Sequence, residues 1–181
     1  KPLMLGGEHS ISSGAVAAVA KQHPDLVLVQ LDAHADLRHE WLGAQHSHAC
    51  AMRRCLEVLP SQTLLQIAIR SGTKEEFSEL ATSGRLTPFE EIAQRLHPLR
   101  GQPLYLTVDL DWFDPAVMPG TGTPEPGGFL WQHFAELVDE LKHHNLVGAD
   151  VVELAPQLDP SGISSVLAAK ATRSLLLLMA Q

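Results

Sequence analysis

Five apolar runs of strand length, each followed by a turn and a helical pattern, limit what this chain can fold into. The runs are residues 2–5, 26–31, 63–70, 103–110 and 146–154. The helical patterns are residues 11–22, 48–59, 74–81, 89–96, 128–143 and 163–180. Strands that alternate with helices indicate βαβ crossovers and a parallel sheet. Because the runs are apolar almost throughout, we expect helices on both faces, which makes a three-layer α/β/α fold.

Composition restricts the domain number and the class of partner. The 181 residues, 45% of them hydrophobic, suffice for one core, so we expect a single domain over residues 1–181. The net charge of −8 and the scattered basic residues argue against a protein that binds nucleic acid or anionic membranes. With only two cysteines, Cys50 and Cys55, and no apolar run of membrane-spanning length, we expect a soluble protein of a reducing compartment, the cytoplasm.

Side chains of the metal-ligand type gather where four of the apolar runs end. In a parallel sheet, ligands bind at the carboxyl ends of the strands. These ends carry Glu8 and His9; Asp32, His34 and Asp36; Asp109, Asp111 and Asp114; and Asp150 and Glu153. Residues two apart in an extended segment point to the same side, so the groups after each run converge.

So many carboxylates in one cleft repel each other and raise each other's pKa values unless cations compensate them. Carboxylates mixed with imidazoles suit divalent metals such as manganese, zinc or nickel, while the lack of thiolates argues against a structural zinc site. Four aspartates and two histidines exceed the needs of one ion, which favours two metals about 3.5–4 Å apart that share ligands.

Single residues also have simpler interpretations. A lone Asp at a strand end is commonly a helix cap, and Asp114 before Pro115 is best interpreted as a turn residue. Asp150 is either an orienting partner of a ligand or a hydrogen-bonded polar group of the core.

Four motifs resemble those of the ureohydrolases, the family of arginase, agmatinase and formimidoylglutamase. In order they are "LGGEHSI", "LDAHADLR", "VDLDWFDPAVMPGTGTPEPGG" and "DVVELAPQLD", and "SHACAMRR" and "QIAIRS" between them resemble agmatinase segments. The resemblance covers essentially the whole chain and implies an arginase/deacetylase-like fold with two Mn²⁺ ions. Family chains extend further before the first motif, so we expect this chain to be an N-terminally incomplete piece of a longer domain.

The resemblance also implies a role for each of eight side chains. The metal ligands would be His9 and Asp36 on the first ion, His34 and Asp111 on the second, and Asp32 and Asp109 bridging both. His48 would transfer a proton, and Glu153 would receive the substrate guanidinium.

The same resemblance suggests a substrate. Arginases have an asparagine where this chain has Arg38, which favours agmatine, cleaved to putrescine and urea. The alternatives are arginase, guanidinobutyrase or formimidoylglutamase activity, or a non-catalytic fragment. A two-metal phosphoesterase is disfavoured because Glu153 would repel a phosphate and no cluster of basic residues accompanies the ligands. The resemblance further implies a homo-oligomer, a trimer or hexamer.

Overall fold

The computed structural model describes residues 1–181 and contains one six-stranded sheet, in which every neighbouring pair is parallel. The strand order is β1-β6-β5-β2-β3-β4. The strands are β1 (Leu3–Leu5), β2 (Val27–Leu31), β3 (Leu64–Ile67), β4 (Leu86–Thr87), β5 (Pro103–Asp109) and β6 (Asn145–Val152). The predicted parallel α/β fold is therefore confirmed.

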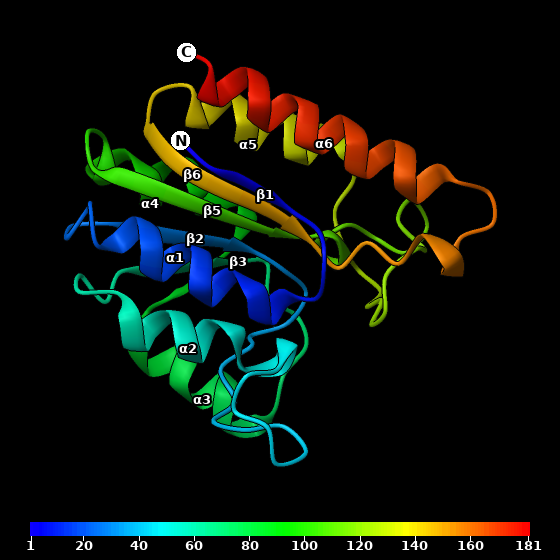
Figure 1. The fold of residues 1–181 in the computed structure, drawn as a ribbon, viewed down its shortest axis with the longest axis horizontal. Coiled ribbons are helices and arrows are strands. Elements are labelled where there is room, and N and C mark those ends of the chain that lie inside the picture. The colour runs from blue at the N-terminus through cyan, green and yellow to red at the C-terminus, as the bar shows by residue number, and fades with distance from the viewer.

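Six α-helices cover the two faces of this sheet (Figure 1). They are α1 (Ser12–Ala20), α2 (Ala51–Val58), α3 (Lys74–Ser83), α4 (Ile92–Leu96), α5 (Trp131–Leu141) and α6 (Ile163–Met179). Short 3₁₀ helices are η1 (His9–Ile11), η2 (His48–Cys50), η3 (Phe89–Glu91), η4 (His97–Leu99), η5 (Leu110–Trp112) and η6 (Pro156–Leu158). None of the helices combines the length and apolar character that crossing a bilayer requires.

The core has two parts because successive strand residues face opposite sides. Val27 and Val29 of β2 pack in the cluster that includes residues of α4, α5 and α6, whereas Leu28 packs with α1 and α2. All five residues of β2 are buried. The continuous apolar run in the sequence thus corresponds to a strand that is covered on both faces.

The sixth strand, β4, was not predicted, because its two residues are too few to show a pattern. It forms by pairing with the end of β3, where Gln66 lies opposite Leu86 and Ile67 opposite Thr87. This pairing places β4 at the sheet edge, away from the centre.

The chain reverses its direction across the sheet between β2 and β5. From β2 it proceeds outward through β3 to β4, and from β5 it proceeds to β6 on the other side. Such a switch point leaves a crevice outside the carboxyl ends of the two strands. Asp32 directly follows β2 and Asp109 ends β5, so the fold places both carboxylates at this crevice.

Candidate metal centre

Two groups of potential ligands lie at the crevice. The first ligand group is His9, Asp32 and Asp109, and the second ligand group is Asp32, His34 and Asp111. Within each group, one ligand atom from every residue lies within 4.8 Å of the others. Because Asp32 belongs to both groups, it is placed as a shared ligand would be. Asp109 falls in the first ligand group alone, so its predicted bridging role stays a prediction.

The imidazole of His9 lies at the centre of the first ligand group. Its Nδ1 atom is 3.1 Å from Asp32 Oδ2, 3.0 Å from Asp36 Oδ2 and 3.2 Å from Asp109 Oδ2. The nitrogen is buried and makes no hydrogen bond. A buried polar atom without a partner among three carboxylates is the arrangement that a bound divalent cation would satisfy. The residues present therefore fit a metal ion.

The second ligand group is arranged around His34. Its Nδ1 atom is 3.0 Å from Asp111 Oδ2 and 3.5 Å from Asp32 Oδ1. Backbone amides fix the carboxylates, because Ala33 N donates to Asp111 Oδ1 at 3.1 Å and His34 N donates to Asp32 Oδ1 at 2.6 Å. The turn after β2 thus positions ligands of its own and also Asp111 of η5, the 3₁₀ helix that follows β5.

The pKa values in the cluster show the electrostatic strain that cations would relieve. Burial lowers the pKa of His9, but the carboxylates of Asp109, Asp32 and Asp36 outweigh burial and hold it well above its ordinary value. Burial also lowers the pKa of His34, yet Asp111 and Asp32 raise it to about 11. Burial, together with the charge of Asp32, raises the pKa of Asp36 to about 7. Without metal, protons take the place of the missing positive charge, so metal binding must displace them.

Two residues predicted in the site have a left-handed backbone. Asp36 has φ 53° and Glu153 has φ 67°. Non-glycine residues adopt this region at a free-energy cost, so such residues concentrate at functional sites. Glu153 is held there by two contacts: its N–H donates to Gly7 O at 3.0 Å and its Oε1 accepts from His9 N at 2.7 Å. The end of β6 is thereby joined to the loop that carries His9.

A cavity of about 240 Å³ adjoins the second ligand group. Its wall includes His34, Asp36, Arg38, Trp41, His48 and Glu76. Glu153 is not in this wall. The side chain of His48 is 45% exposed, and its Nδ1 lies 3.9 Å from Glu8 Oε2 and 3.5 Å from Ser47 Oγ. The ring of His48 is therefore open to solvent.

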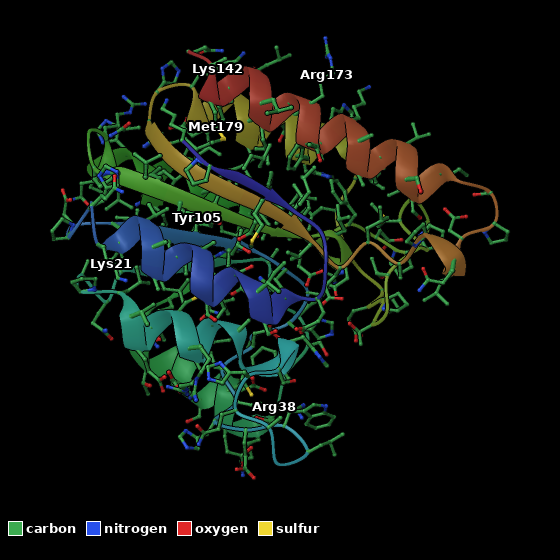
Figure 2. The ribbon with its side chains drawn as sticks, viewed as in Figure 1. Lys21, Arg38, Tyr105, Lys142, Arg173 and Met179 are labelled. Atoms are coloured by element: carbon green, nitrogen blue, oxygen red, sulfur yellow. The ribbon has the colours of Figure 1, made fainter.

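Arg38, labelled in Figure 2, forms part of the same wall. Its guanidinium lies 4.2 Å from the centroid of the Trp41 ring, and its Nε is 3.7 Å from Glu76 Oε2. Glu76 is buried, accepts from Leu37 N at 2.9 Å and forms a capping box with Thr73 at the start of α3. The positive charge of Arg38 is thus partly compensated by a fixed carboxylate.

Several residues that support the ligands were missed in the sequence. Gln30 Nε2 donates to Asp32 Oδ2 at 2.6 Å, and Gln66 Nε2 donates to Gln30 Oε1 at 2.6 Å. Thr123 Oγ1 donates to Asp111 Oδ2 at 3.2 Å. Gln30 and Gln66 could have been found from the sequence, because each is a glutamine inside an otherwise apolar strand and a buried polar side chain needs a hydrogen-bond partner.

Arg70, just after β3, was also missed. Its Nη2 donates to Asp111 O at 2.7 Å and to Glu125 O at 2.8 Å, and its Nη1 donates to Trp112 O at 3.4 Å. The guanidinium fork therefore ties the segment that carries Asp111 to the loop of residues 114–129. Asp114 has the predicted turn role in that loop, where it accepts from the amides of Ala116, Gly127 and Gly128.

Comparisons with known proteins place this architecture in one family. The agmatinase of Halalkalibacterium halodurans is 38% identical over an alignment of 185 positions that covers 97% of this chain and 63% of that protein. The guanidinobutyrase of Pseudomonas aeruginosa is 36% identical over 93% of this chain and 57% of its own length. A crystal structure from Clostridium difficile, provisionally assigned as an agmatinase, superposes with a TM-score of 0.93 at 38% identity, covering 98% of this chain and 67% of that one.

The chain thus spans about 63% of the length of the agmatinases of Halalkalibacterium halodurans and Bacillus anthracis. The sequence profile of the Arginase family matches residues 1–178, nearly the whole chain. The crevice with its two ligand groups is accordingly that of a protein which belongs to the arginase family.

Proposed function

We propose that this chain carries the active site of a ureohydrolase that binds two Mn²⁺ ions and cleaves agmatine to putrescine and urea. The observation that carries the proposal is the pair of ligand groups that share Asp32. When bound, two divalent ions supply an activated water as nucleophile and compensate the aspartates. Manganese is inferred from the family resemblance and not from the ligand types, because zinc and nickel accept similar ligands.

Glu153 is proposed to bind the substrate guanidinium. Its Oε1 already accepts from His9 N, so Oε2 remains for a guanidinium N–H. A charge-assisted hydrogen bond of this kind both attracts and orients a planar cation. Because Glu153 is joined to the loop that carries His9, it would fix the guanidinium carbon relative to the first ligand group.

His48 is proposed to protonate the departing amine. Collapse of a tetrahedral intermediate requires a proton on the leaving nitrogen, and an imidazole is suited to deliver it near neutral pH. His48 lies in the cavity wall, and its partly exposed ring can regain a proton from solvent.

A guanidino acid is a second candidate substrate, because Arg38 places a cation in the cavity wall. A carboxylate at the far end of the substrate would be attracted to Arg38. The ammonium of agmatine would be repelled by Arg38 unless the carboxylate of Glu76 neutralises the charge of Arg38. The 36% identity to a guanidinobutyrase is in keeping with this possibility. Agmatine ranks first because the Arg38–Glu76 contact of 3.7 Å provides that compensation.

A urea-release assay with added Mn²⁺ tests the proposal on agmatine, arginine and guanidinobutyrate, and a formamide-release assay tests formimidoylglutamate, which has no guanidino group. We expect release mainly from agmatine, little from arginine, and none from an Asp109→Ala variant. If guanidinobutyrate is the better substrate and Arg38→Met removes that preference, the second candidate is correct.

The non-catalytic alternative is tested by the same protein. A folded chain that binds two ions per molecule, yet releases no urea from the three guanidino compounds and no formamide from formimidoylglutamate, would establish it. Folded protein that binds no divalent ion would refute the metal centre itself. The trimer or hexamer and the cytoplasmic location stay predictions, which light scattering and cell fractionation can check.

A further inference from the structure

A row of four buried polar side chains crosses the centre of the sheet beneath the candidate metal centre. Gln66, Gln30, Thr107 and Asp150 occupy paired positions on β3, β2, β5 and β6, and each is fully buried. Paired residues of a parallel sheet point to the same face, which here is the face covered by α1 and α2, where Tyr105 packs. Burying polar groups is unfavourable unless they are hydrogen-bonded, so the side chains of this row must find hydrogen-bond partners inside the protein.

Asp150 accepts two hydroxyl hydrogens. Thr107 Oγ1 donates to Asp150 Oδ1 at 2.6 Å, and Tyr105 OH donates to Asp150 Oδ2 at 2.9 Å. Tyr105, labelled in Figure 2, lies in the interior of the molecule and is fully buried. The carboxylate thereby fixes the direction of the Thr107 hydroxyl.

The remaining contact of Thr107 is with His9, whose Nε2 lies 2.9 Å from Thr107 Oγ1. A hydroxyl has one hydrogen, and Asp150 takes it, so toward His9 the Thr107 oxygen can only accept. The proton of the neutral imidazole must then sit on Nε2. Once metal binding has displaced the Nδ1 proton, the lone pair of Nδ1 therefore faces Asp32, Asp36 and Asp109.

We propose that Thr107, oriented by Asp150, is a positioning residue that fixes His9 in its Nε2–H tautomer and so keeps Nδ1 free to bind a divalent cation. This inference rests on the metal centre of the proposed function. Among the proposed ligands, the Thr107 side chain hydrogen-bonds only to His9, so it would act through that ring. Hydrogen bonds that orient a ligating histidine typically change metal affinity about 10–100-fold.

Loss of the Thr107–His9 hydrogen bond should weaken the binding of one ion only. The ring of His34 contacts Asp32 and Asp111 and has no bond to the polar row. Loss of the Thr107 hydroxyl is therefore expected to weaken the binding step of the first ligand group and to leave the other step unchanged.

The test is titration of the metal-free full chain with Mn²⁺, followed by calorimetry and electron paramagnetic resonance. Thr107→Val keeps the side-chain shape without the hydroxyl and should weaken one of two binding steps about 10–100-fold. Thr107→Ser restores the hydroxyl and should bind within a few-fold of the parent. Tyr105→Phe is the matched control, because it removes a bond to Asp150 but leaves the Thr107–His9 contact.

The inference is overturned if Thr107→Val binds both ions like the parent, or if Thr107→Ser is as weak as Thr107→Val. It is also overturned if both steps weaken equally while the metal-free protein unfolds at a lower temperature, since that pattern indicates a structural role. Ring ¹⁵N shifts of His9 in the parent protein loaded with Zn²⁺ give a readout that needs no variant. A proton on Nε2 supports the inference, and a proton on Nδ1 refutes it.

These outcomes do not depend on urea release. A parent protein that binds two ions and releases no urea leaves the role of Thr107 intact and refutes the proposed activity. A parent protein that binds two ions, with Thr107→Val unchanged, refutes the role of Thr107 alone.

Discussion

Replacing Arg70 by methionine tests whether its guanidinium holds the segment that carries Asp111. The two shortest donations, 2.7 Å to Asp111 O and 2.8 Å to Glu125 O, come from one charged group. A hydrogen bond from a charged group contributes about 1.5–3 kcal/mol, and we take the lower value because Arg70 is only partly buried. Two such bonds give a loss of about 3 kcal/mol. For a domain of this size, that loss lowers Tm by roughly 6–12 °C.

Thermal unfolding of the metal-free protein, followed by circular dichroism, measures this loss without a contribution from bound ions. Arg70→Lys keeps the charge but not the fork, so we expect about half of the effect. Arg173→Met is the matched control, since Arg173 on α6 is exposed, donates no hydrogen bond and points away from the sheet (Figure 2). An Arg70→Met variant whose Tm falls no further than that of the Arg173→Met control refutes the reasoning.

Three further predictions concern the loop and the site. In Gly128→Ala the new Cβ would lie 2.5 Å from Asp114 N, so the free energy of unfolding, measured in urea, should fall by roughly 1–3 kcal/mol. Gly122→Ala is the control: its Cβ has no atom within 4 Å, and its free energy of unfolding should stay within about 0.5 kcal/mol of the parent. Equal losses in the two variants would contradict this prediction. His48→Ala should lower kcat about 10²–10⁴-fold with Mn²⁺ binding intact, and unchanged kcat would remove His48 from its proposed role. Asp111→Asn should lower the metal content from two ions per chain to one in elemental analysis, and two retained ions would exclude Asp111 as an essential ligand.

The fold was largely predictable because its central strands are buried on both faces, which gives continuous apolar runs. Element ends were less predictable, because tertiary contacts set them. Residues 128–143 were predicted as a helix, but α5 begins only at Trp131. Phe129 instead pairs with Phe113, and Gly128 lies against the backbone at Asp114. A local pattern contains no information about such a partner.

In the site, too, local features were predictable and features set by tertiary contacts were not. The eight residues proposed for the site could be proposed from the sequence because strand ends and motif spacing are local features. Gln30, Gln66 and Thr107 were not singled out, because their importance depends on register: they lie opposite one another only after β2, β3 and β5 have paired. Arg70 was missed for a related reason, since its partners are backbone carbonyls more than forty residues away in the chain, at Asp111 and Glu125.

The left-handed backbone at Asp36 and Glu153 has a consequence for attempts to make the protein more heat-resistant. Glycine adopts this conformation without the steric penalty of a side chain, so Asp36→Gly and Glu153→Gly relieve strain of about 1 kcal/mol or more per position. Glu153→Gly would also remove the hydrogen bond that Glu153 accepts from His9 N, so laboratory evolution that rewards survival on heating alone should enrich glycine at position 36. The resulting variants would be more stable but would lack a carboxylate beside His9. Selection for stability in this protein must accordingly be coupled to a screen for metal binding or urea release.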